Sequence, residues 1–146
     1  MRFKSQIALL GIVGALSASL SWQTRAEEAA RLASKGIYTA EQAGTGKAIY
    51  TAQCAACHGG NMAGIDVAPP LKGSAFLSAW SGKSVSVLDT RIRRTMPPDK
   101  PGSLNLDQAA SVTAYILGYN GFPAGKTPLP SRPADQRSLI IDQLRR

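Results

Sequence analysis

The spacing of apolar residues along the chain predicts a small domain built from helices. In residues 84–94, Val85, Leu88 and Ile92 lie at i, i+3 and i+7, which places them on one face of a helix. A second stripe of this kind lies in residues 105–119 and contains Val112, Tyr115, Ile116 and Tyr119. Few segments alternate between apolar and polar residues as half-buried strands do. The pattern therefore predicts an all-α fold.

A further helix is predicted for residues 39–56. Thr39 and Gln42 match a capping box at its start. Gly44 and Gly46 would each weaken an isolated helix, by about 1 kcal/mol. We expect these glycines to allow the close approach of another helix or of a bound group.

The remaining segments give weaker signals. A long loop with Pro69, Pro70 and Leu71 follows residues 59–60. Residues 125–133 are rich in proline and are predicted to be extended. Residues 134–146 contain Leu139, Ile140 and Leu144 and are expected to form a short docked helix. The role of the basic end, DQLRR, is not assigned.

The first residues have the pattern of a secretory signal peptide. Arg2 and Lys4 precede an apolar run from Ile7 to about Leu20, and a polar stretch ends at Ala26. This three-part pattern predicts a signal peptide at residues 1–26. The alternative, an uncleaved membrane anchor, needs roughly 20 apolar residues and is less favoured. We expect an exported, soluble, periplasmic protein without stable membrane insertion.

The charge of the chain excludes one class of function. The 146-residue chain has a formal net charge of +8, and removal of Arg2, Lys4 and Arg25 with the signal peptide would leave +5. This excess is too modest for the dense basic stripe of a nucleic-acid-binding protein. It suits an acidic protein partner.

The two cysteines of the chain, Cys54 and Cys57, lie in the stretch CAACH with its single histidine, His58. A thioredoxin-like site would need βαβ surroundings, and a zinc site would need four ligands. A disulfide would leave the adjacent histidine unexplained. The fourth interpretation, covalent attachment of c-type haem, accounts for the three residues together. The cysteines lie on one helix face and can bond two vinyl groups, while His58 ligates the iron.

A second axial ligand is expected on the other face of the haem. Met62 follows His58 by four residues and lies on the same side, so it is expected to be a packing residue. Met96 follows His58 by 38 residues and precedes Pro97 and Pro98, which stiffen the loop. Met96 is therefore the predicted ligand, with core packing as the alternative. His/Met ligation raises the reduction potential.

Three further features of the sequence have two interpretations each. A ligating histidine needs a partner for its other ring nitrogen, and the carbonyl of Pro69 can accept that hydrogen bond, although a rigid loop alone would also explain the proline. Arginines 91, 93 and 94 precede Met96 and either dock an acidic partner or form a solvated helix face, where one could pair with a haem propionate. Trp80 packs either against haem or in the core, and the core is favoured.

With these features the chain resembles a class I cytochrome c. The resemblance implies that Gly46 and Tyr50 of the first helix meet Tyr115 of the last helix. Over roughly residues 36–130 the chain is similar to cytochrome domains attached to, or partnered with, bacterial quinoprotein alcohol dehydrogenases. The segments that carry this similarity are GIYTAEQAGTGKAIYTAQCAACHG, FLSAW, TMPPDKPGSL and AYILGYNGFPAGKTPLP.

The resemblance implies electron transfer rather than enzymatic turnover. We expect a signal peptide at 1–26, a cytochrome c domain at 36–124 with one haem c and its iron, and an extension at 125–146. The expected partners are a dehydrogenase as electron donor and an oxidase or another cytochrome as acceptor. The alternatives are a subunit fixed in a dehydrogenase complex and, less favoured, a peroxidase-like haem protein.

Overall fold

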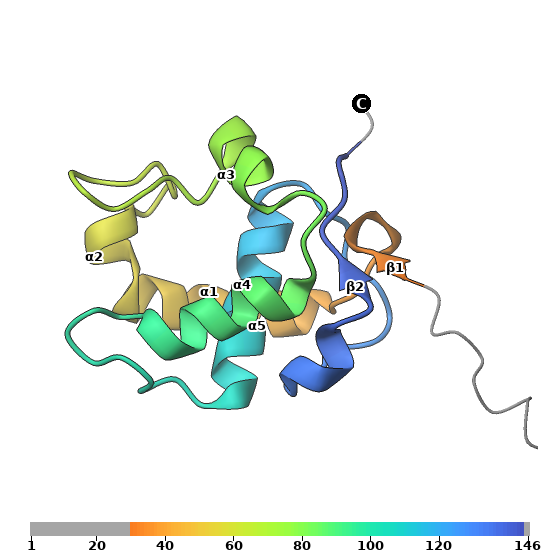
Figure 1. The fold of residues 1–146 in the computed structure, drawn as a ribbon. Helices are drawn as coiled ribbons and strands as arrows, with labels where there is room; N and C mark the ends of the chain where they lie inside the picture. The colour runs from red at the N-terminus through yellow and green to blue at the C-terminus, as the bar shows by residue number, and fades with distance from the viewer. Residues whose placement is uncertain (1–29, 145–146) are drawn as a thin grey trace, which may run out of the picture.

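The computed structural model describes residues 30–144, and the predicted signal peptide lies outside them. This part of the chain is mostly helical, as predicted, with one minimal sheet (Figure 1). The elements are β1 (Arg31–Leu32), η1 (Ala33–Lys35), α1 (Ala40–Gln53), α2 (Ala55–His58), α3 (Gly73–Trp80), α4 (Val85–Thr95), α5 (Leu106–Tyr119), η2 (Pro133–Gln136) and β2 (Leu139–Ile140), where η marks a 3₁₀ helix. No helix among residues 30–144 is both long and apolar enough to cross a membrane.

The centre of the fold is the contact between α1 and α5, which are the most extensively packed pair of elements (Figure 1). Gly46 makes this contact possible, because a Cβ at that position would overlap the backbone carbonyl of Ser111. Beside it, the rings of Tyr50 and Tyr115 meet edge to face with 5.4 Å between their centroids. The predicted meeting of Gly46 and Tyr50 with Tyr115 is thus confirmed. A Cβ added at Gly44 would meet no atom of another segment within 4 Å, so close approach does not explain this glycine.

The helix caps differ in part from the prediction. The Thr39 side chain accepts a hydrogen bond from the Gln42 backbone N–H (3.2 Å), as a capping box requires. The Gln42 side chain does not return to Thr39 and instead forms two hydrogen bonds with the backbone of Leu129. A complete capping box is present at α5, where Asn105 and Gln108 exchange both hydrogen bonds.

Two helices flank the central pair. In α4, the predicted stripe of Val85, Leu88 and Ile92 is buried. Helix α3 lies in a region for which the sequence pattern predicts no helix, and it buries Phe76. Trp80, its last residue, is half-buried and packs against the core, with 6.4 Å between its ring centroid and that of Phe76.

The C-terminal segment corrects the prediction of a docked helix for residues 134–146. It folds as the short 3₁₀ helix η2 and then as β2, which pairs in parallel with β1. The register places Leu139 opposite Arg31 and Ile140 opposite Leu32. Leu139 and the following Ile141 are buried, so the segment docks through an extended backbone. Pairing with β1 satisfies backbone groups that a short isolated helix would leave to water.

Candidate haem-binding site

The stretch CAACH spans the junction between α1 and α2. The backbone of Cys54 leaves the helical region at φ −123°, so α1 ends there and α2 carries Cys57 and His58. Both thiols are free, with Cys54 half-buried and Cys57 exposed. His58 is buried, at 9% exposure. The junction thus presents two separate thiols beside one buried imidazole.

One ring nitrogen of His58 is held by the loop that follows. The Nδ1 atom lies 2.9 Å from the carbonyl oxygen of Pro69, as the sequence predicted. A proline carbonyl can only accept a hydrogen bond, so Nδ1 carries the proton and donates it. The other nitrogen, Nε2, is therefore the one with a free lone pair. This is the tautomer that a metal-ligating histidine needs.

The loop that carries Pro69 is fixed at several points. The buried Tyr50 hydroxyl donates to the carbonyl of Gly59 (2.8 Å), directly after His58. Farther along, the Leu71 N–H donates to the carbonyl of Met62 (2.9 Å), and Met62 is completely buried, as expected for a packing residue. Asn120 at the end of α5 donates to the carbonyl of Leu71 (2.9 Å). Two helices therefore hold the histidine loop in position.

Sequence reasoning missed two of these positioning residues. The Asn120 side chain also accepts a hydrogen bond from the Gly73 N–H (2.8 Å) and so joins the end of α5 to the start of α3. Tyr50 was expected only to pack against Tyr115. No local pattern marks either bond, because each joins a side chain to a backbone group of another segment.

Burial shifts the acid–base behaviour of two groups at this end of the molecule. It raises the pKa of the Cys54 thiol to about 11, and the nearby Cys57 adds to the shift. It also raises the pKa of Tyr50 to about 12, with smaller contributions from Cys54, Tyr115 and Tyr119. Both groups are therefore neutral near pH 7, and Tyr50 keeps the proton that it donates to Gly59.

Met96 reaches this region from a separate part of the chain. It is the C-cap of α4, with an extended backbone (φ −119°, ψ 147°) and an N–H that donates to the carbonyl of Ile92. Its side chain is half-buried. Figure 1 shows α2 and the loop after α4 at the same end of the molecule. Arg93 and Arg94 occupy the last turn of α4 beside this residue.

These residues fit a covalently attached haem. The two thiols are free and three residues apart, and the imidazole has its Nε2 atom available. Among residues 30–144, no group of three or more His, Cys, Asp or Glu side chains is arranged to hold a metal ion directly. The donor set thus has the composition that c-type haem requires.

Comparisons with known proteins agree with this site. Residues 41–116, just over half of the chain, match the family model described as cytochrome C oxidase, cbb3-type, subunit III. A comparison with curated proteins gave no match. Among solved structures, the chain is similar to the sulfane dehydrogenase SoxCD from Paracoccus pantotrophus, with 21% sequence identity and a TM-score of 0.53. That match covers 73% of this chain and 53% of the other, so this chain spans about half its length.

The fold and the site define a class I c-type cytochrome. The chain belongs to the cytochrome c domain family of the cbb3-type oxidase subunit III. Membership establishes one covalently bound haem c with its iron, and electron transfer rather than enzymatic catalysis. The structural likeness to SoxCD supports the fold.

Proposed function

We propose that this protein is a periplasmic cytochrome with a single haem that carries one electron at a time from a dehydrogenase to a terminal oxidase or another cytochrome. The observation that supports it best is the hydrogen bond from His58 Nδ1 to Pro69, which prepares Nε2 for iron beside two free thiols. When bound, the haem supplies reversible one-electron exchange.

The residues of the chain have distinct roles in this proposal. Cys54 and Cys57 would hold the haem through thioether bonds, and His58 would ligate its iron. Pro69 fixes the ring of His58 and its tautomer. Met96 would be the other ligand of the iron, and its soft thioether would favour ferrous iron and raise the reduction potential. With His58 and Met96 both bound, the iron would have no open position for a substrate.

The proposed partners follow from the proteins that the chain is similar to and from its surface charge. The sequence resembles cytochromes that serve quinoprotein alcohol dehydrogenases, and the similar solved structure is itself named a sulfane dehydrogenase. The family is named after a subunit of an oxidase. These names support a dehydrogenase as donor and an oxidase or cytochrome as acceptor. Arg91 and Arg94 are exposed on α4 and would suit an acidic partner.

A second candidate function is an electron-transfer subunit held permanently in a complex. The matching family is named after a subunit of an oxidase, which favours a cytochrome that stays in its complex. Gel filtration of native periplasmic extract separates the two functions, since a free carrier elutes near the size of one chain. Elution with a dehydrogenase or an oxidase would favour the fixed subunit.

The axial ligand can be tested with two matched variants, Met96→Leu and Met62→Leu, in haem-loaded protein. Met96→Leu should abolish the far-red methionine–iron charge-transfer band of the ferric protein and lower the reduction potential, because leucine cannot ligate iron. Met62→Leu should retain the band, since Met62 packs in the core. Optical spectra and redox titrations report both properties.

Two results would contradict the proposal. An unchanged band in Met96→Leu would show that another group ligates the iron. A haem that is not reduced reversibly, or that exchanges no electrons with periplasmic redox proteins in stopped-flow mixing, would exclude the carrier function. Recovery of the oxidised and the reduced protein with bound partners from periplasm would identify the donor and the acceptor.

A further inference from the structure

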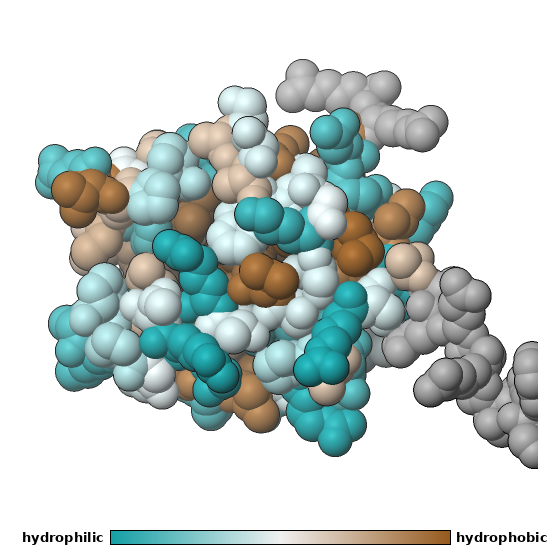
Figure 2. Space-filling view, viewed as in Figure 1, coloured by the Kyte–Doolittle hydropathy of each residue, from teal (hydrophilic) through white to brown (hydrophobic). Residues whose placement is uncertain are grey.

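A basic pocket lies between α4 and the C-terminal segment, and its α4 side extends to the last turn of the helix, next to Met96. Its volume is about 410 Å³. Helix α4 contributes most of its lining, and the segment around η2 closes one side. The lining includes Arg93, Arg94, Arg137, Ser86, Thr90 and Val87. In Figure 2, hydrophilic residues surround a small hydrophobic patch on the face over α4.

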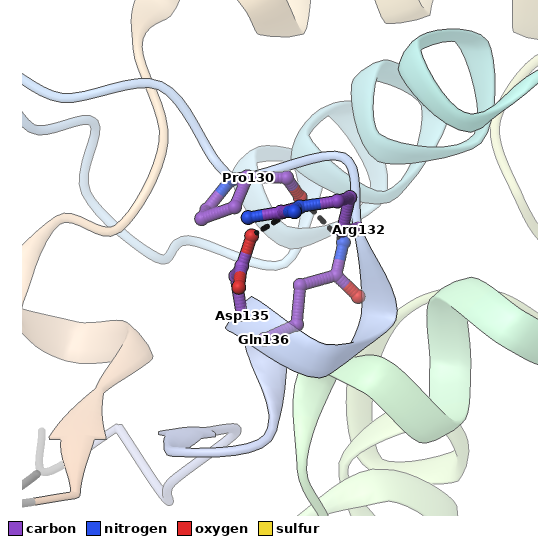
Figure 3. Close-up of polar contacts among 4 residues, drawn as sticks. All are labelled: Pro130, Arg132, Asp135 and Gln136. Atoms are coloured by element: carbon purple, nitrogen blue, oxygen red, sulfur yellow. Dashed lines mark hydrogen bonds and ion pairs between the residues drawn. The ribbon is translucent and has the colours of Figure 1, made fainter.

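Three arginines converge on this pocket from two segments that are distant in the sequence. Arg93 and Arg94 come from the last turn of α4, and Arg137 follows η2. Within residues 30–144, the single ion pair joins Arg132 to Asp135 (2.8 Å; Figure 3). The three arginines of the pocket therefore have no carboxylate within salt-bridge distance in this part of the chain. Like charges gathered on one surface repel one another and destabilise the fold. An anion in the pocket would remove that cost.

The side chain of Arg93, which lines the pocket, is partly buried. Its Nε atom is buried and has no hydrogen-bond partner among the described residues. Asp89, one turn earlier on α4, lies near enough to feel the charge of Arg93, yet one of its own carboxylate oxygens is also unpaired. A buried guanidinium N–H without an acceptor is costly. Because the Nε atom itself is buried, only the accessible part of the Arg93 side chain, which lines the pocket, can meet an anion there.

We propose that this pocket binds a phosphate-type oxyanion, meaning inorganic phosphate, sulfate or the phosphate of a larger molecule. Guanidinium groups present planar sets of N–H donors that match phosphate oxygens. Ser86 and Thr90 add hydroxyl donors at the wall of the pocket. Three positive charges match the two negative charges of a phosphate or sulfate dianion better than they match the one charge of a carboxylate. The C-terminal segment supplies Arg137, so it has a binding role in addition to its structural one.

The test uses haem-loaded protein and titration calorimetry with sodium phosphate and sodium sulfate, with sodium chloride at matched ionic strength as the control anion. Saturable binding of one phosphate or sulfate per chain is expected, and none of chloride. In the double variant Arg94→Gln/Arg137→Gln, the affinity should fall at least about tenfold, as the loss of charge-assisted hydrogen bonds implies. Both arginines are exposed, so the fold should persist.

A matched control separates local contacts from general charge effects. Arg91→Gln/Arg132→Gln removes the same net charge from α4 and the C-terminal segment, outside the pocket lining. Its affinity for phosphate should change less than about twofold, because the bonding groups remain. Equal weakening in both double variants would overturn the proposal, since it would reflect net charge alone.

A second arm identifies the source of the phosphate. Phosphatidylcholine vesicles with and without phosphatidic acid present the same group as a lipid headgroup. Binding to the acidic vesicles that is lost in Arg94→Gln/Arg137→Gln, without binding of free phosphate, would support the site with a lipid as its ligand. Absence of pocket-dependent binding in both arms would overturn the proposal. Binding of a glutamate-rich peptide alone would also overturn it, in favour of an acidic protein partner.

Discussion

The two ends of this molecule are stabilised in different ways. At the CAACH end, residues 59–72 form no helix and are held by a few hydrogen bonds from Tyr50, His58 and Asn120. At the opposite end the chain closes on itself. There β2 pairs with β1, the Gly125 N–H donates to the carbonyl of Tyr38, and Gln42 forms two bonds with Leu129.

This difference indicates that haem would supply part of the core at the CAACH end, whereas the chain supplies the core at the opposite end. At the haem end the backbone hydrogen bonds are local, such as those from the Met62 N–H to Gly59 and from the Gly64 N–H to His58, and bound haem would complete the core there. At the C-terminal end, buried residues such as Leu139 and Ile141 and hydrogen bonds between distant segments complete the core. The stability of the first end should therefore depend on the haem, and that of the second on the chain.

The largest effect is expected when haem attachment is prevented. The double variant Cys54→Ala/Cys57→Ala should leave little stable fold, because haem burial supplies much of the core in so small a domain. Far-UV circular dichroism and urea unfolding should show a shallow, non-cooperative transition. A haem-free variant that unfolds cooperatively would show that the contacts at the C-terminal end are enough to stabilise the whole domain. Met96→Leu, which keeps the thioether bonds, serves as the control.

A second prediction concerns the helix contact that joins the two ends. Gly46→Ala places a methyl group against the Ser111 carbonyl, so the helices must separate, at a cost of about 3 kcal/mol of unfolding free energy. Gly44→Ala, two residues earlier on the same helix, meets no atom within 4 Å. It should stabilise the protein by about 0.5–1 kcal/mol through helix propensity. Chemical unfolding of both holo-proteins measures the contrast, and equal effects would contradict it.

The same contrast explains which features could be predicted from the sequence. The helix stripes in α4 and α5 were predictable because apolar residues three and four apart need only local geometry. CAACH was predictable because thioether and iron chemistry require those residue types next to one another. Pro69 as the partner of His58 followed from the need of a ligating histidine for an acceptor.

The features that sequence reasoning missed depend on contacts between distant segments. Thr39 is three residues from Gln42 and predicts a capping box, but only the backbone N–H of Gln42 bonds to Thr39. The partner of the Gln42 side chain, Leu129, is 87 residues away. The parallel pairing of β1 with β2 involves two residues in each strand, too few to produce an alternating pattern. Such short elements form only because the rest of the fold brings them together.

A third prediction uses a buried carboxyl at the junction of α4 with the C-terminal segment. Burial raises the pKa of Asp89 from its ordinary value of 3.8 to about 6, against the opposing effects of Gln136, Thr113 and Arg93. The pKa of Asp89 is thus higher in the folded state than in the unfolded state, so the protonated carboxyl contributes fully to stability below about pH 4. As the pH rises to about 6 this contribution is lost, and the free energy of unfolding falls by up to about 3 kcal/mol.

Asp89→Asn should remove this pH dependence. Urea unfolding at pH 4 and pH 7 should show a smaller fall in stability for the variant than for the wild type. Asp99→Asn changes an exposed carboxyl and should keep the fall of the wild type. Asp89 Oδ2 and Gln136 Oε1 are both buried acceptors without a donor, which agrees with a carboxyl that retains its proton. An unchanged fall in Asp89→Asn would show that folding does not shift the pKa of Asp89.

The smallest effect is expected at the bond that joins the C-terminal segment to α1. Gln42→Ala removes two hydrogen bonds, 2.8 Å and 2.9 Å long, to the buried Leu129, and should cost about 1–2 kcal/mol of unfolding free energy. Gln53→Ala, at the exposed end of the same helix, should be nearly neutral. Hydrogen exchange at the Leu129 amide gives a local measurement, because that N–H loses its acceptor. Faster exchange at the Leu129 amide, with unchanged exchange at the amides next to His58, would show that the two ends of the molecule open independently. Equally faster exchange at both places would show that the two ends open as one unit.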